Sequence, residues 1–185
     1  MSVLTLDQME SVIWRATVLT LGLDPGSSEE SVHKRVRISW PDGEGTTWDR
    51  NENTIFFRIT PTPDDFTPLK DVTHVYDSAR DTLTEKVEYH RRFSVNWLCY
   101  GPDGMNDADT IRIGILRNPA KALLSAYGIE FMPHIHEPHR LDELDQSGDW
   151  WRRTDLSADF YILTSREYSE EYIAIAPEIS VLPNN

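Results

Sequence analysis

The stretch from Val87 to Tyr100 constrains the fold of this chain more than any other part of the sequence. Six apolar residues share one parity and five polar residues the other: Val87, Tyr89, Phe93, Val95, Trp97 and Cys99 against Glu88, His90, Arg92, Ser94 and Asn96. Side chains alternate across a strand, so this pattern predicts one apolar and one wet face. A strand of about 14 residues far exceeds the usual length of about 5–6 and suits the centre of an antiparallel sheet. It carries no catalytic grouping, which indicates an architectural protein.

Composition narrows the class of protein. The chain has 185 residues, which fits one domain over 1–185, and a formal net charge of −13. Such a charge disfavours specific binding to nucleic acid and to anionic membranes. It would suit the lining of a channel through which DNA passes without being bound. Cys99 is the only cysteine, so the chain can form no internal disulfide, and its parity predicts a buried thiol. We therefore expect a chain compatible with a reducing cytoplasm.

The sequence shows no targeting or membrane signal. Its first residues lack the basic residues and small-residue cleavage site of a signal peptide. No uncharged apolar run approaches the roughly 20 residues that span a bilayer. We expect a soluble, unsecreted protein that makes no membrane contact.

The periodicities predict an α+β fold: a single antiparallel or mixed β-sheet with two helical segments packed on one face. Thr5 and Gln8 form a capping box that opens an N-terminal helix over 5–22, and the sheet and helices occupy 32–181. Strands are expected at Val32–Trp40, Thr54–Thr60, Val72–Tyr76, Val87–Tyr100, Ile129–Ile135, Trp150–Thr164 and Tyr172–Val181. The two helical segments are expected to begin at Asn106 and at Pro119, and Leu141–Gly148 is expected to be a loop.

The segment from Pro61 to Asp71 is expected to be a functional loop. It holds three prolines and cannot be regular structure. As the tip of a hairpin between two long strands, it should project from the sheet. Phe66 and Leu69 would lie in water there, so we expect them to contact another subunit. In the alternative interpretation they fold back onto their own domain.

A second candidate interface surrounds Trp150 and Trp151. Adjacent residues of a strand point to opposite faces, so one of the two indoles should face away from the core. Arg152 and Arg153 follow directly, and exposed tryptophan beside arginine is typical of interface hot spots. Simple packing is the competing interpretation of these four residues.

The sequence contains little that points to catalysis or metal binding. His134 and His136 have the spacing of two metal ligands on one side of a strand, and His139 could add a third. Pro133 and Pro138 bracket them, so a solvated strand end is the simpler interpretation. No nucleotide-binding loop, nucleophile elbow or zinc-protease motif is present. The sequence predicts no enzyme and no cofactor.

Several stretches together resemble the neck and tail terminator proteins of tailed bacteriophages. They are Val36–Trp40 with the turn after it, Thr54–Ile59, Glu88–Pro102 with its helix, Gly128–Ile129 opening a strand, and Trp151–Arg153 leading into Ala158–Thr164. The resemblance covers roughly Val32 to Val181. It implies a neck terminator-like fold with no catalytic or cofactor-binding residue.

The resemblance also implies a function and partners. The expected protein is a virion component, present in the host cytoplasm during assembly, that forms a ring, commonly of six subunits. The ring caps the head-proximal end of the tail tube, ends tube polymerisation and joins the tail to the head connector. Its partners would be its own copies, the tail tube protein and a connector or head-completion protein, with genomic DNA passing through unbound. A head-completion protein, or a metal- or ligand-binding domain using His134, His136 and His139, is the alternative.

Two further expectations concern such a ring. The Pro61–Asp71 loop, and the Trp150–Arg153 stretch, would contact a subunit or the tail tube. Part of the excess acid would line the channel and repel DNA at short range. The acids in question are Asp64, Asp65 and Asp71 in the proline-rich loop, and Asp142, Glu143 and Asp145. Ordinary solvated loop charges are the alternative.

Overall fold

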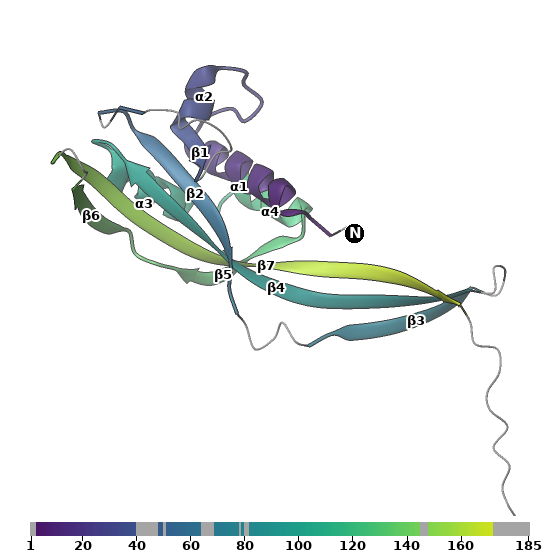
Figure 1. Ribbon diagram of the computed structural model, residues 1–185. Coiled ribbons are helices and arrows are strands. Elements are labelled where there is room, and N and C mark those ends of the chain that lie inside the picture. Colours follow the sequence, from purple (N-terminus) through teal and green to yellow (C-terminus); the bar gives the residue numbers. More distant parts are fainter. Residues whose placement is uncertain are drawn as a thin grey trace, which may run out of the picture.

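The computed structural model describes residues 3–39, 48–49, 51–63, 69–77, 79, 82–144 and 148–171. It confirms the α+β class, with a mixed sheet of seven strands and a layer of helices. The helices lie on one side of the sheet, over half of its length, and a strand-only extension runs beyond them (Figure 1). The predicted strand Tyr172–Val181, together with Trp40, Asp64, Asp65, Phe66 and Asp145, lies outside the described residues.

The elements follow one another in the order α1α2β1β2β3β4α3α4β5β6β7. The helices are α1 (Leu6–Thr20), α2 (Glu30–Arg35), α3 (Gly104–Gly114) and α4 (Ala120–Ala126). The strands are β1 (Val36–Ile38), β2 (Thr54–Pro61), β3 (Asp71–Asp77), β4 (Thr82–Tyr100), β5 (Ile129–Ile135), β6 (His139–Leu144) and β7 (Trp150–Glu171). The sheet order is β1-β2-β4-β7-β5, with β3 also on β4 and β6 also on β7.

Strands β4 and β7 form the spine of the sheet. They pair antiparallel without interruption, from Thr82 opposite Glu171 to Tyr100 opposite Arg153. The predicted long strand is therefore confirmed and begins five residues earlier, at Thr82 rather than Val87. The predicted strand from Trp150 likewise continues to Glu171. Each strand supplies the other's hydrogen bonds, so both can be longer than their apolar runs alone require.

The helices bury the apolar face that the alternation predicts. Phe93, Val95, Trp97 and Cys99 are all buried, and the Trp97 indole donates to Thr17 Oγ1 of α1 at 3.0 Å. The predicted capping box of α1 is present, with Thr5 accepting from the Gln8 amide and Gln8 accepting from the Thr5 amide. The core is thus a single apolar layer between the helices and one face of the sheet.

The turn after β4 depends on a glycine. Gly101 has φ +100°, and a Cβ placed there would lie 2.6 Å from Asn53 Oδ1 and 2.8 Å from the Glu52 carbonyl oxygen. Asn53 also accepts from the Asp103 amide at 2.9 Å and donates to the Asp103 carboxylate at 2.8 Å. These contacts start α3 at Gly104, with Asp103 at the N-cap, so the predicted N-cap at Asn106 was wrong.

The predicted strand Val32–Trp40 was wrong over its first half. Glu30–Arg35 form α2, and only Val36–Ile38 are a strand, paired in parallel with β2. Local contacts favour the helix: Lys34 and Glu30 form an i, i+4 ion pair at 3.0 Å, and His33 stacks on Trp14. The strand prediction depended on the alternation of Val36, Ile38 and Trp40. Three residues are too few to show where a strand begins and a preceding helix ends.

The predicted loop Leu141–Gly148 was also wrong in part, because His139–Leu144 form β6 on the edge of β7. Asp142 lies across from Arg152, and Glu143 accepts a hydrogen bond from Arg153 of β7. Cross-strand pairing of opposite charges stabilises a strand whose own composition reads as a loop.

The proline-rich segment does not lie at a hairpin tip, so this part of the prediction was wrong. β2 ends with Pro61 opposite Phe93, and β3 begins with Asp71 opposite Glu88, both on the same edge of β4. Both ends of the segment therefore lie on this edge, midway along β4. The hairpin tip is the connection between β3 and β4, after Asp77.

Candidate assembly surfaces

The sheet face opposite the helices carries an aromatic cluster near the start of β7. Trp48, Phe56, Tyr100 and Trp151 are in mutual ring contact, with centroid separations from 4.8 to 6.2 Å. Three strands and one segment before β2 contribute these rings. The cluster fixes Trp151 within the protein, and Trp151 is half-buried.

Trp150 is the indole that faces water, whereas Trp151, on the face away from the helices, is half-buried. Trp150 is 65% exposed, and its cross-strand neighbour Leu144 is 54% exposed. Both lie on the parity of β7 that faces the helices elsewhere, since Thr154 and Leu156 of that parity are buried. The pair therefore forms an uncovered apolar corner of the sheet, beyond the helical layer.

The two arginines after the tryptophans have different environments. Arg152 is exposed. Arg153 donates to Asp155 at 2.6 and 2.7 Å and to Glu143 at 3.1 Å, and the hydrogen bonds to Asp155 and Glu143 raise its pKa. Arg153, which was predicted to lie in an interface, is therefore hydrogen-bonded to Glu143, which was predicted to line the channel.

Glu143 also accepts a hydrogen bond from the Tyr100 hydroxyl at 3.1 Å. Burial, with the negative charge of Glu143 beside it, raises the pKa of Tyr100 to about 12. The phenol is therefore protonated at neutral pH and donates to Glu143. Glu143 is a structural partner of Tyr100 and Arg153 as well as a candidate for a channel.

The other candidate acids are spread along the sheet. Asp142 on β6 lies 3.6 Å from Arg140, and both side chains are more than half exposed. Asp71 begins β3 opposite Glu88, which in turn lies opposite Ser165 of β7. Glu143 lies opposite Trp151 of β7. Asp71 and Glu143 are therefore separated by about 46 Å along β7, at about 3.3 Å per residue.

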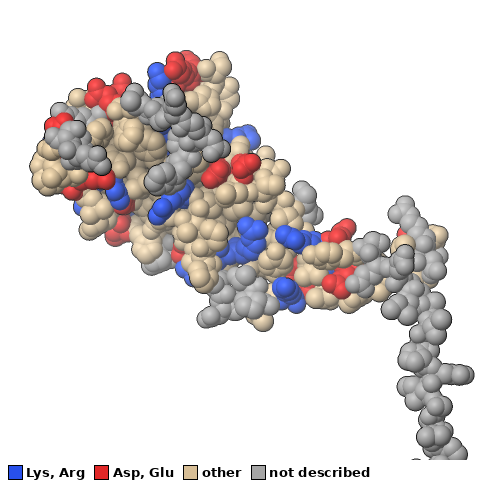
Figure 2. All heavy atoms as spheres, in the orientation of Figure 1, with Lys and Arg blue, Asp and Glu red and all other residues tan. Residues whose placement is uncertain are grey.

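The visible face of the molecule shows no continuous acidic patch among its described residues, since red and blue side chains alternate over it (Figure 2). Leu69, the described member of the predicted loop contact, is 67% exposed. It lies beside Lys70 and Asp71, at the point where the chain rejoins the edge of β4. Its apolar side chain has the exposure that the prediction requires.

The histidines are near one another in the chain but do not form a described metal centre. His136 follows the end of β5, where its amide donates to the Ser157 carbonyl, and His139 begins β6 opposite Asp155. Both are exposed, and the His134 side chain is outside the described part. Within that part, no group of three His, Cys, Asp or Glu residues is arranged to hold a metal ion.

Sequence reasoning missed a buried polar network where β2 and β5 end and the sheet narrows. Asp159 of β7 is 6% exposed. It accepts from Arg92 at 2.6 Å and from Ser94, directly across the sheet, and Ser94 contacts Thr62 at 2.8 Å. Burial alone would raise the pKa of Asp159, but the hydrogen bonds from Ser94 and Arg92 outweigh it and hold the pKa below its usual value. We call Thr62, Arg92, Ser94 and Asp159 the junction network.

None of the helices in the described residues is long and apolar enough to cross a membrane. A model of the family described as phage neck terminator protein matches residues 7–184 of the chain. No curated protein matches the sequence.

Proposed function

Because this chain belongs to the phage neck terminator protein family and is thus a structural protein of the phage neck, we propose that it assembles into a closed ring of six subunits. The ring caps the head-proximal end of the tail tube, stops tube polymerisation and joins the tail to the head connector. Its proposed partners are its own copies, the tail tube protein and a connector or head-completion protein. It resides in the virion and assembles in the host cytoplasm, and we propose no catalytic role for it.

The observation that carries this proposal is the family match, which spans nearly the whole chain rather than one motif. The elongated shape of the molecule agrees with it (Figure 1). A ring needs one heterologous contact repeated until it closes, and an elongated subunit with different surfaces at its two ends can supply one.

The test is to assemble tail tubes with and without the purified protein. We expect tubes of defined length that end in a ring and bind heads when the protein is present, and longer tubes that bind no heads when it is absent. Electron microscopy measures both. A protein that binds connectors but leaves tube length unchanged would instead be a head-completion protein.

The proposed channel contribution has its own test. We propose that acids among Asp64, Asp65, Asp71, Asp142, Glu143 and Asp145 face the passing DNA, which they repel within a Debye length of about 8 Å. The net charge of −13 supports this. Asp142→Lys should slow DNA ejection without changing tail length, and Asp142→Asn should have a smaller effect. Unchanged ejection by the lysine variant at low salt would exclude Asp142 from the channel.

The proposed contact of the Pro61–Asp71 loop with a subunit or the tail tube is tested by Phe66→Ala combined with Leu69→Ala. The exposure of Leu69 supports this contact. We expect fewer head–tail joints at unchanged stability of the monomer. Joining at wild-type levels would show that the loop is no assembly contact. Trp150→Ala and Arg152→Ala test the second candidate interface in the same assay.

The metal-binding alternative predicts stoichiometric zinc in purified protein, removed by a His136→Ala, His139→Ala double substitution. Elemental analysis measures it. We expect no stoichiometric metal, because Glu137 near these histidines is already bonded to Arg112.

A further inference from the structure

Two buried arginine–aspartate pairs in the helix-covered part of the molecule, which we call the body, differ in how fully their carboxylates are bonded. In the junction network, one oxygen of Asp159 accepts from Arg92 and the other from Ser94. The second pair joins two helices, with Arg35 of α2 donating to Asp107 Oδ1 of α3 at 2.6 Å. Among the described residues, Asp107 Oδ2 and Arg35 Nη1 are buried without a hydrogen-bond partner.

Both members of the Arg35–Asp107 pair are largely removed from water. Asp107 is 8% exposed, and the Arg35 side chain is 23% exposed. A buried pair stabilises a fold only when further hydrogen bonds satisfy its remaining donors and acceptors, because removing two charges from water can cost more free energy than their attraction returns. Burial accordingly raises the pKa of Asp107 in spite of the opposing effect of Arg35, whereas the pKa of Asp159 is lowered. The attraction within this pair therefore does not offset the hydration that its two charges lose.

The segment that carries Arg35 is weakly anchored. From Asp24 to Arg35, Val32 is the only residue that is buried, and His33 stacks on Trp14 with 4.9 Å between the ring centroids. α2 has six residues and no side-chain hydrogen bond at its N-cap, so it is too short to be stable alone. In Figure 1, α2 and the loop beside it project above α1. A segment with so few buried apolar contacts is one that opens locally.

We propose that residues 24–35, which we call the strap, open from the body while the sheet stays folded, and that the incompletely bonded Arg35–Asp107 pair lowers the free-energy cost of this opening. In the closed state the pair is buried with two atoms unbonded, and in the open state both charges regain water. The inference concerns the single subunit and does not depend on the proposed ring. Elements that move when a partner binds are drawn from the least stable parts of a fold, so the strap is where such a change would begin.

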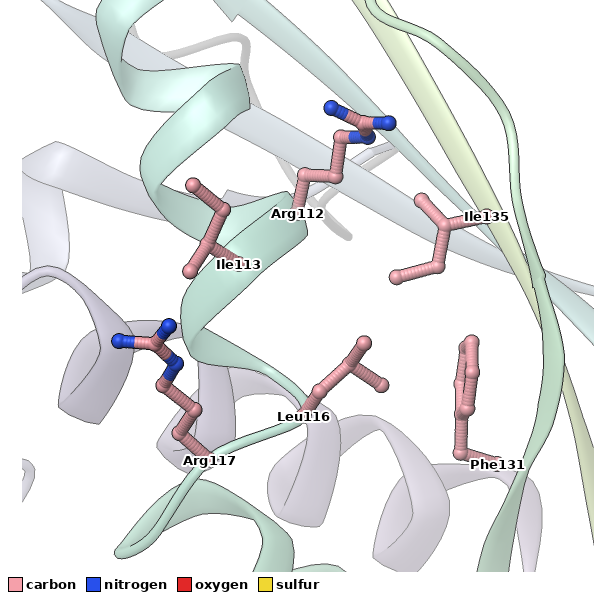
Figure 3. Close-up of a pocket in the computed structure, with 6 residues that line it drawn as sticks. All are labelled: Arg112, Ile113, Leu116, Arg117, Phe131 and Ile135. Carbon is pink, nitrogen blue, oxygen red and sulfur yellow. The ribbon is translucent and has the colours of Figure 1, made fainter.

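A second arginine pair, at the other end of α3, provides a comparison. Arg112 donates to Glu137, and their side chains are 33% and 78% exposed, so water reaches both charges. Arg112 lies at a groove of about 540 Å³ between the end of α3 and β5, which is also lined by Ile113, Leu116, Arg117, Phe131 and Ile135. In Figure 3 the Arg112 guanidinium lies away from Leu116 and Phe131, which face one another across the groove. Replacing Arg112 should therefore leave the opening of the strap unchanged.

Hydrogen exchange of the wild-type protein tests the opening itself. After correction for intrinsic rates, we expect the amides of α2 to exchange at least about 100-fold faster than those of β4 that pair with β7. A low concentration of urea should accelerate exchange of the β4 amides much more than that of the α2 amides, because local opening exposes little surface. Mass spectrometry of peptic fragments measures both rates.

Replacing the pair tests its role. Arg35→Met combined with Asp107→Leu removes both charges and keeps a similar total volume, so it should slow α2 exchange by about 10-fold. Arg35→Met alone leaves a buried carboxylate without a partner, so it should speed α2 exchange by about 10-fold or more. Lys34→Met is the matched control on α2, because it removes only the exposed pair with Glu30, and should change the rate by about 2-fold at most. Arg112→Met is the control on α3.

Each measurement can refute the inference. Wild-type α2 amides that exchange no faster than β4 amides would mean that the strap opens only when the whole protein unfolds. Exchange of α2 that the double substitution leaves unchanged would mean that the pair is not broken in the opening, and faster exchange would mean that the pair holds the strap closed. Either result overturns the role of the pair. The double variant contains no unpaired buried charge, so it provides this test even where Arg35→Met alone fails to fold.

Discussion

Asp159→Asn should destabilise the protein by about 2–3 kcal/mol at pH 7. Asp159 accepts hydrogen bonds from Arg92 and Ser94 on the neighbouring strand. Hydrogen bonds to a charged group contribute about 1.5–3 kcal/mol each. Asparagine keeps one acceptor oxygen, and the Arg92 side chain is 27% exposed and can recover part of its hydration. These two effects reduce the expected cost to about 2–3 kcal/mol, just below the range of about 3–5 kcal/mol for a broken buried pair.

The lowered pKa of Asp159 determines how the cost of Asp159→Asn changes with pH. The pKa of Asp159 in the folded protein lies below its usual value, so the native state binds fewer protons than the unfolded chain. The stabilisation is therefore fully present above the pKa of an unfolded aspartate, about 3.9, and is lost as the pH falls through the folded value. The free-energy difference between wild type and Asp159→Asn should be constant from pH 7 to about pH 5 and shrink below about pH 4.

Urea unfolding at several pH values measures both quantities. With a slope of about 2 kcal/mol/M, the midpoint should fall by about 1 M at pH 7. Asp142→Asn is the matched control, because its pair with Arg140 is exposed and should contribute less than about 1 kcal/mol. Equal midpoints for the two variants at pH 7, or a difference between wild type and Asp159→Asn that is as large at pH 3 as at pH 7, would refute the role assigned to the network.

Three further predictions concern the core and its turn. Trp97→Phe should cost about 2–3 kcal/mol in urea unfolding, because it removes the indole donor to Thr17 and leaves a cavity. Gly101→Ala should cost at least about 2 kcal/mol in the same assay, because alanine at φ +100° would clash with Asn53. The Cys99 thiol is buried and its pKa is raised by that burial, so a thiol reagent should modify it only as fast as the protein unfolds.

The α+β class could be predicted from the sequence because the clearest pattern, the apolar–polar alternation along β4, is also what decides which side chains enter the core. The alternation from Phe93 to Cys99 corresponds to a real division between helix-covered and open faces. The failures occur where pairing between distant segments overrides local composition. The acidic stretch after His139 becomes a strand because arginines of β7 lie opposite it, and no local pattern could show that.

The candidate surfaces were predictable only in part. Alternation placed Trp150 and Trp151 on opposite faces of the sheet, but it could not show which of them would be exposed or that Trp151 lies in an aromatic cluster. Asp159 lies on the polar parity of an amphipathic strand, where sequence predicts a solvated side chain. It is buried because Ser94 and Arg92 meet it from a segment about 65 residues away in the chain.

The position of the junction network bears on assembly as well as on stability. It lies where the pairing of β2 and β5 stops, with Pro61 opposite Phe93 and Ile129 opposite Ile162, and beyond it β3, β4 and β7 continue the sheet as a three-stranded ribbon. Hydrogen bonds that join β4 to β7 at this point fix the direction in which the ribbon leaves the body. A head-to-tail contact closes into a ring only when the rotation between successive subunits has the correct value, and otherwise it continues as an open helix. In the proposed ring, a contact made through the ribbon would give a rotation that depends on the angle between ribbon and body. Ring size would then be set at the junction network.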